Sequence, residues 1–238
     1  MPNIELTDPE PTLVVSEVFG PTFQGEGLSL GRRAAFLRLG RCNLDCTWCD
    51  TPFTWDWDRY DPAVELRERL VADVVDELAA MDVDRVVVTG GEPLLQQRRL
   101  LPFLDVARAR GWAVEVETNG TIAPTPATAA LVERFNVSPK LANSGVPEER
   151  RVVPAALAAL VATGAASFKF VVGDVAELDE VGELVVAHAL RPVVIMPEGT
   201  APDVVLARGR ALADEVATRG WHLTTRLHVL LWGDERGR

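Results

Sequence analysis

Short apolar runs rich in β-branched residues alternate along this chain with longer stretches whose apolar residues recur at helical spacing. The runs predict strands at residues 13–19, 34–39, 85–90, 113–117, 135–138, 167–172, 192–196 and 225–231. The clearest helical stretch begins at Asp61, an N-cap residue followed by Pro62, and its apolar residues keep helical spacing as far as Met81. Further helices are predicted near residues 95–110, 126–134, 153–163, 174–189 and 202–219.

This alternation is typical of βα units repeated around a mainly parallel sheet. Eight complete units would use about 250 residues, and the first two predicted strands have no helix of useful length between them. We therefore expect an α/β fold of the incomplete, open TIM-barrel type, formed as one domain over residues 1–238 with residues 1–12 as a flexible tail. In such folds the functional residues gather at the carboxyl ends of the strands.

The net charge and the amino-acid composition of the chain limit the kinds of molecule that it is expected to bind. The net charge of the 238-residue chain is −11, which argues against a nucleic-acid surface and favours small-molecule partners. No apolar run reaches the roughly 18–20 residues that a membrane span needs, and the amino terminus does not resemble a signal peptide, so we expect a cytoplasmic protein. The three cysteines are an odd number and are clustered, which disfavours a disulfide framework.

The cysteines Cys42, Cys46 and Cys49 follow the predicted strand 34–39 with the spacing C-x3-C-x2-C. Thiolates in one loop can converge on one centre, and soft sulfur ligands select iron–sulfur clusters, zinc or copper. A structural zinc site needs a fourth ligand, which His228 could supply by folding back. Three cysteines could instead hold three irons of a 4Fe–4S cluster and leave the fourth iron open to a substrate.

Polar turns follow the next three predicted strands. TGGEP (89–93) contains two glycines that let a ligand approach the backbone, while ETNG (117–120) and SPK (138–140) end the following strands. Each could be an ordinary turn on its own, because Asn-Gly and Ser-Pro are common turn sequences. On consecutive strands they predict a single site.

The cysteine spacing, Trp48 and TGGEP together resemble the radical S-adenosylmethionine (SAM) superfamily. The resemblance implies a radical SAM core with a 4Fe–4S cluster on the three cysteines. It also implies that the open iron chelates the methionine part of SAM, and that an electron cleaves SAM to methionine and a 5′-deoxyadenosyl radical. The residues that the resemblance assigns to SAM are Trp48, Thr89, Gly90, Gly91, Glu92, Glu117, Asn119, Ser138 and Lys140.

Four more segments, FQGEG (23–27), FLRL (36–39), CDT (49–51) and RLHVLLWG (226–233), are similar to the 7-carboxy-7-deazaguanine synthase family. This resemblance covers nearly the whole chain. It implies ring contraction of 6-carboxy-5,6,7,8-tetrahydropterin with loss of ammonia, in the biosynthesis of queuosine-type deazapurines. It further implies Mg²⁺ as a cofactor, an electron donor such as flavodoxin or ferredoxin, and a homodimer.

The chemistry of that substrate suggests its contacts. A carboxylate favours a bidentate guanidinium, for which Arg38 is the candidate, and the pterin edge needs mixed donors and acceptors, for which Gln24, Glu26 and His228 are candidates. The resemblance places magnesium at Thr51, and Mg²⁺ needs few protein ligands because it keeps several waters. Without the resemblance, Thr51 would be interpreted as a turn or helix cap.

Some features leave alternatives open. Family members commonly carry glycine immediately before the first cysteine, whereas this chain has Arg41, so the backbone of this loop cannot rely on the freedom of glycine. The charge of Arg41 would favour reduction of a nearby cluster. The alternative functions are another radical SAM enzyme, such as a glycyl-radical activase, and a zinc-binding interaction protein. Lys169, one of only two lysines, has no assigned role.

Overall fold

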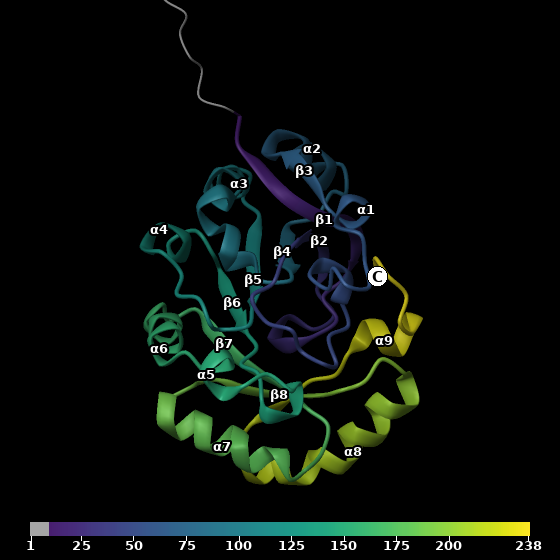
Figure 1. The fold of residues 1–238 in the computed structure, drawn as a ribbon, viewed down its shortest axis with the longest axis vertical. Coiled ribbons are helices and arrows are strands. Elements are labelled where there is room, and N and C mark those ends of the chain that lie inside the picture. The colour runs from purple at the N-terminus through teal and green to yellow at the C-terminus, as the bar shows by residue number, and fades with distance from the viewer. Residues whose placement is uncertain (1–9) are drawn as a thin grey trace, which may run out of the picture.

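The computed structural model describes residues 10–238, whose strands form one sheet of nine strands in the order β3-β1-β2-β4-β5-β6-β7-β8-β9 (Figure 1). The strands are β1 (Thr12–Phe23), β2 (Arg33–Leu39), β3 (Arg67–Leu70), β4 (Arg85–Gly90), β5 (Ala113–Thr118), β6 (Arg134–Val137), β7 (Ala166–Val172), β8 (Val193–Pro197) and β9 (His222–Leu223). β1 pairs antiparallel with β2 and β3, and every neighbouring pair from β2 to β9 is parallel.

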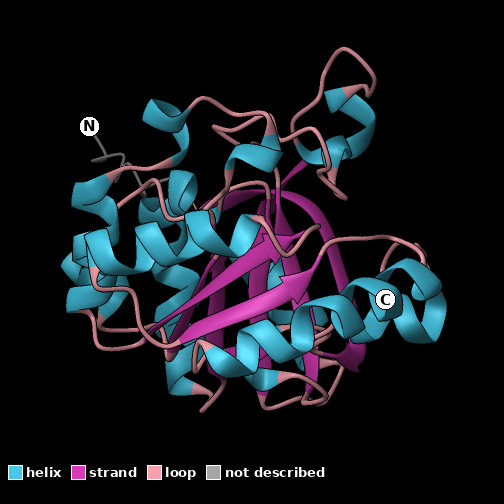
Figure 2. Cartoon of the chain, turned by 90° about the horizontal axis from the view of Figure 1, so that it is seen from below, coloured by secondary structure: helices cyan, strands magenta, loops and turns pink. Residues whose placement is uncertain are grey.

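The helices are α1 (Pro62–Glu65), α2 (Val71–Ala79), α3 (Gln97–Ala109), α4 (Pro126–Ala129), α5 (Glu148–Arg151), α6 (Pro154–Ala162), α7 (Glu177–His188), α8 (Pro202–Thr218) and α9 (Leu227–Trp232), with 3-10 turns η1 (Gly27–Ser29), η2 (Pro52–Thr54), η3 (Pro93–Gln96) and η4 (Ala142–Ser144). The longer helices α2, α3, α6, α7 and α8 cover the outer side of the curved sheet, and α9 lies at the open side of the barrel (Figure 1 and Figure 2). Because the terminal strands β3 and β9 do not pair with each other in the described part of the chain, the barrel is open. The predicted open α/β fold is confirmed.

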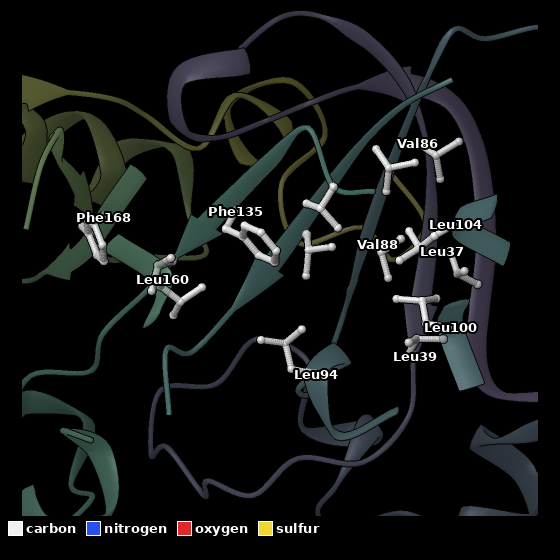
Figure 3. Close-up of a cluster of buried hydrophobic side chains, with 14 of the residues drawn as sticks. Leu37, Leu39, Val86, Val88, Leu94, Leu100, Leu104, Phe135, Leu160 and Phe168 are labelled. Carbon is white, nitrogen blue, oxygen red and sulfur yellow. The ribbon is translucent and has the colours of Figure 1, made fainter. Parts of the chain in front are cut away.

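The main hydrophobic core lies between the sheet and the outer helices (Figure 3). Leu37 and Leu39 of β2 are fully buried there against side chains such as Leu100 of α3. Burial of each such side chain contributes about 1.5–3 kcal/mol. Since successive strand residues face opposite sides of a sheet, Phe36 and Arg38 point to the concave side, where Phe36 belongs to a separate small cluster. The packing of the core therefore directs the alternate residues of each strand into the barrel interior.

The helix predicted from Asp61 to Met81 is interrupted. The Asp61 side chain does accept a hydrogen bond from the backbone N–H of Ala63 at 2.8 Å, but α1 has only one turn. Residues 67–70 form β3 instead, because the free edge of β1 offers them backbone hydrogen bonds. Leu66 leaves the helix and packs onto Gly40, and helical spacing resumes in α2.

Two other predicted elements differ from the structure. The predicted strand at 225–231 is wrong, because these residues enter α9; a short apolar run does not by itself distinguish a strand from a helix. The predicted helix at 126–134 ends at Ala129. Of the predicted flexible tail, residues 1–9 lie outside the described residues, and Thr12 already belongs to β1. Among the described residues, no helix is long and apolar enough to cross a membrane.

Candidate active site

A cavity of about 490 Å³ opens inside the barrel, where the carboxyl ends of β2, β4, β5 and β6 meet the cysteine loop and the residues around α9. The suggested residues that line it are Gln24, Glu26, Arg38, Cys42, Cys46, Trp48, Cys49, Thr51, Thr89, Gly90, Gly91, Glu117, Asn119, Ser138, Lys140 and His228. Glu92 is the one suggested residue outside this lining. Residues from 24 to 228 in the sequence thus converge on a single space.

The cysteine loop is held by backbone contacts at both ends. The N–H of Arg41 donates to the carbonyl of Thr54 at 2.7 Å, and the N–H of Thr47 donates to the carbonyl of Ser144 at 2.9 Å. Cys46 packs in a small apolar cluster against which Cys42 and Cys49 also lie. The loop therefore presents its three thiols from a fixed backbone.

The electrostatics of the thiols fit a cationic cluster. Burial raises the pKa of the Cys42 thiol to about 11, and burial also raises the pKa of Cys46. Thiolates are thus disfavoured until a metal centre supplies positive charge, since iron binds the deprotonated form. A zinc site through His228 would need this side chain to reach the cysteines, whereas its Nε2 lies 3.9 Å from the carboxylate of Glu26. A 4Fe–4S cube, by contrast, spreads its thiolates over separate irons.

The two glycines of TGGEP are required for close backbone packing as well as for access by a ligand. A Cβ atom on Gly90 would collide with the backbone of Leu39, and one on Gly91 would collide with the carbonyl of Arg41. The turn can therefore lie directly against the cysteine loop. Arg41 itself has φ 75°, so it adopts the left-handed conformation for which glycine is usually selected. In this chain, arginine thus occupies a backbone conformation that glycine adopts without strain.

Glu92 lies behind the cavity wall and is fully buried. Its carboxylate accepts hydrogen bonds from the N–H of Leu94 at 2.9 Å, the N–H of Asn119 at 2.7 Å and the hydroxyl of Thr118 at 2.8 Å. Burial raises the pKa of Glu92, although these hydrogen bonds oppose the shift. These contacts join the turn after β4 to the end of β5, so Glu92 positions the wall, and a direct contact with SAM stays a prediction.

One wall of the cavity is formed by Thr89, Glu117 and Gln24. Glu117 accepts hydrogen bonds from the hydroxyl of Thr89 at 2.7 Å and from Nε2 of Gln24 at 3.1 Å. Next to the cysteines, the ammonium group of Lys140 lies 5.2 Å from the centre of the Trp48 ring and donates to the hydroxyl of Ser138 at 3.0 Å. This arrangement places a carboxylate, hydroxyls, a cation and an aromatic face around one space.

A buried group of charges around Glu26 forms a second wall, which adjoins the first because the N–H of Glu26 donates to Oε1 of Gln24 at 3.2 Å. The Glu26 carboxylate pairs with the ammonium of Lys169 and, at 3.3 Å, with Nε of Arg226, while Nε2 of His228 lies 3.9 Å away. Burial would raise the pKa of Glu26, but the charges of Lys169 and Arg226 outweigh it and lower the pKa well below its usual range. Burial lowers the pKa of His228, which favours its neutral form. Glu26 is therefore an ionised acceptor beside a neutral imidazole.

Sequence reasoning gave no role to Arg226 and left Lys169 unassigned. Arg226 donates to Asp50 and, at 2.6 Å, to the carbonyl of Gly199, so it ties the cysteine loop to the end of β8. Lys169 is only 6% exposed, and its partner Glu26 is 143 residues away. The rarity of lysine was the only sequence signal for Lys169. Arg226 opens the segment RLHVLLWG, which carried the family resemblance, but nothing in the local sequence indicated its pairing with Asp50, 176 residues away.

Arg38 points into the cavity from the end of β2. Its Nε donates to Glu17 at 2.8 Å, and its guanidinium lies 5.3 Å from the centre of the Phe19 ring and 5.9 Å from that of Phe53. Among the described residues, only Nε of this guanidinium has a hydrogen-bond partner. A carboxylate and two rings therefore hold the Arg38 side chain inside the cavity, not in solvent.

Thr51 also faces the cavity. It is the N-cap residue of η2, yet its side chain makes no capping hydrogen bond; its hydroxyl lies 3.7 Å from Sγ of Cys49. Thr51 thus occupies the N-cap position of η2 without capping it through its side chain. The hydroxyl is placed where a hard cation next to the cysteine loop could use it.

Comparisons with known proteins agree with this geometry. The family model of the Radical SAM superfamily matches residues 37–143. A 7-carboxy-7-deazaguanine synthase from Pyrobaculum aerophilum is 39% identical over 231 residues, covering 96% of this chain and 98% of the relative. The synthase of the same name from Halobacterium salinarum is 34% identical, covering 98% of each chain. The crystal structure of QueE from Escherichia coli superposes with a TM-score of 0.70 at 27% identity, covering 91% of this chain and 95% of that one.

The open parallel barrel and the cysteine loop at its carboxyl end define a radical SAM enzyme. Within that class, the two curated synthases are each more than 30% identical to this chain over nearly its whole length, which identifies the family. The chain belongs to the 7-carboxy-7-deazaguanine synthases.

Proposed function

We propose that this chain converts 6-carboxy-5,6,7,8-tetrahydropterin to 7-carboxy-7-deazaguanine with loss of ammonia, as a radical SAM lyase that serves a queuosine-type deazapurine pathway. One observation carries the proposal: a single cavity joins the three thiols to Arg38 and to the charged wall around Glu26. When bound, a 4Fe–4S cluster on Cys42, Cys46 and Cys49 supplies the electron that cleaves SAM. The remaining steps depend on how the chain holds its two substrates.

The first wall suits SAM. The Glu117 carboxylate accepts from Thr89 and Gln24 and still offers lone pairs for ribose hydroxyls. Trp48 offers a face for adenine, and its Nε1–H is fixed by the side chain of Asn143 at 3.2 Å. Gly90 and Gly91 leave backbone groups accessible to the methionine part. Asn119, Ser138 and Lys140 complete the set proposed for SAM, together with the predicted contact of Glu92.

The second wall suits the pterin. The Arg38 guanidinium is proposed to bind the substrate carboxylate, because charge-assisted bidentate bonds favour that pairing. Ionised Glu26 accepts N–H donors from the pterin ring, while Gln24 and neutral His228 provide mixed donor and acceptor atoms. Mg²⁺ is proposed to bind at the Thr51 hydroxyl, next to that carboxylate. Enclosure by the barrel wall keeps reactive intermediates away from water.

Partners are proposed by the same reasoning. A small electron-transfer protein such as flavodoxin or ferredoxin is proposed to supply electrons in the cytoplasm. A homodimer is also proposed. Its support is a set of exposed apolar side chains in the neighbouring segments 23–30 and 227–232, namely Phe23, Leu28, Leu30 and Leu231. The ring of Phe23 stacks on that of the half-buried Trp232, which joins the two segments.

Substrate dependence tests the proposed function. The reconstituted protein is incubated anaerobically with SAM, Mg²⁺ and a strong reductant, together with the carboxylated pterin, the same pterin without its carboxylate, or a glycyl-radical enzyme. We expect product formation only with the carboxylated pterin. Activation of the glycyl-radical enzyme with no conversion of either pterin would replace this proposal by the activase function.

A further inference from the structure

Trp55 makes an unusual contact with the cysteine loop. Its indole Nε1 lies 3.3 Å from Sγ of Cys49, within hydrogen-bond range for sulfur. Indole N–H can only donate, so the sulfur is the acceptor. Trp55 lies six residues beyond Cys49, and its ring lines the cavity.

The backbone holds this donor in place. The N–H of Trp55 donates to the carbonyl of Pro52 at 3.0 Å, which closes η2. The preceding residue, Thr54, is fully buried and accepts the N–H of Arg41 through its carbonyl. Backbone hydrogen bonds therefore fix the segment that carries Trp55 against the start of the cysteine loop.

The three sulfurs differ in their surroundings. Cys42 has the backbone N–H of Leu44 at 3.5 Å, and the side-chain nitrogen of Asn119 is 4.0 Å away. Among the described residues, Cys49 is the cysteine with a side-chain N–H closest to its sulfur, and a single substitution can remove that donor without touching the backbone.

We propose that Trp55 is a positioning residue that donates its indole N–H to the Cys49 thiolate of the cluster and raises the cluster's reduction potential. The proposal rests on the proposed cluster. Reduction adds an electron and thus negative charge to the cluster and its sulfurs, so a hydrogen-bond donor stabilises the reduced form more than the oxidised form. Trp55 makes the electron transfer that precedes SAM cleavage more favourable.

The test compares Trp55→Phe with Trp57→Phe in otherwise complete, cluster-loaded protein. Phenylalanine keeps an aromatic ring and removes the N–H. Trp57 is the matched control, because it lies two residues away, is 39% exposed and has no side-chain hydrogen bond among the described residues. The midpoint potential is measured by an EPR-monitored titration with dithionite, without SAM or pterin.

We expect Trp55→Phe to lower the equilibrium constant for one-electron reduction about tenfold, equivalent to about 59 mV. Trp57→Phe should leave it unchanged. Equal potentials for Trp55→Phe and the unsubstituted protein, at equal iron content, would overturn the proposal.

A second measurement tests the contact in the unsubstituted protein itself, so that its overturning result does not depend on the Trp55 variant. Protein labelled with ¹⁵N at the indole nitrogens is reduced, and pulsed EPR detects nitrogen coupled to the cluster. We expect a coupling that persists in Trp57→Phe and disappears in Trp55→Phe; its absence from the unsubstituted protein would overturn the proposal. Neither measurement uses pterin, so a failure of ring contraction would not affect them. Absence of any 4Fe–4S signal would overturn both this proposal and the proposed function.

Discussion

Replacement of Arg41 by glycine should stabilise the protein. Arg41 has φ 75°, a conformation that costs an L-residue roughly 1–2 kcal/mol. Its side chain is exposed and makes no hydrogen bond or ion pair with the other described residues, so little is lost by its removal. Its backbone N–H and carbonyl bonds, to Thr54 and Glu92, are available to glycine as well.

The expected gain follows from two opposing contributions. Glycine removes the conformational cost in the folded state. It also raises the conformational entropy of the unfolded chain, which lowers the free energy of unfolding by about 0.4–1 kcal/mol. We therefore expect Arg41→Gly to raise the free energy of unfolding by about 0.5–1 kcal/mol. For a chain of this size that corresponds to a rise in Tm of about 1–4 °C.

Urea denaturation of the metal-free protein under reducing conditions measures this change. Arg32→Gly is the matched control, because Arg32 is also exposed and lies in a loop but does not have a positive φ. That variant should lose about 0.4–1 kcal/mol. A destabilised Arg41→Gly protein, with a loss equal to that of the control, would refute the account of the loop.

Three further predictions concern the cavity. Lys169→Met removes the charge that most strongly lowers the pKa of Glu26, so that this pKa rises and the acid limb of kcat/KM for the pterin should move to higher pH. The control Lys169→Arg keeps the charge and should keep the original pH profile. An unshifted acid limb in Lys169→Met would contradict the role assigned to Glu26. Arg38→Ala should raise the pterin KM by about 10–150-fold, from the loss of a charged hydrogen bond of about 1.5–3 kcal/mol, while slow SAM cleavage without pterin persists; an unchanged KM would place the substrate carboxylate elsewhere. Alanine replacement of any one of the three cysteines should abolish SAM cleavage, and a variant that retained turnover would exclude the cluster.

The local sequence predicted the central strands, which are buried on both faces. β4 and β7 contain apolar runs with valine, β2 contains the apolar run AAFL, and all three strands were located to within about one residue. The strand β3 could not be predicted, because its sequence RERL has no apolar pattern and it forms only where the edge of β1 is available. The segment after Arg226 was assigned as a strand because six residues are too few to separate the two periods.

The residues of the candidate site were easier to predict than the hydrogen bonds and ion pairs between them. Turns at consecutive strand ends meet because parallel strands place them on one edge, and this rule identified Thr89, Glu117 and Ser138. The pairing of Glu26 with Lys169 and Arg226 joins residues 143 and 200 positions apart, which no spacing rule reports. Glu92 carried a motif signal, yet its carboxylate bonds the protein's own backbone.

The central claim is that this cavity performs ring contraction of a carboxylated pterin by radical SAM chemistry. Mass spectrometry of the products tests it most directly, after anaerobic incubation of the reconstituted protein with SAM, reductant, Mg²⁺ and 6-carboxy-5,6,7,8-tetrahydropterin. The account predicts a product lighter than the substrate by ammonia. SAM cleavage with the pterin recovered unchanged would contradict it.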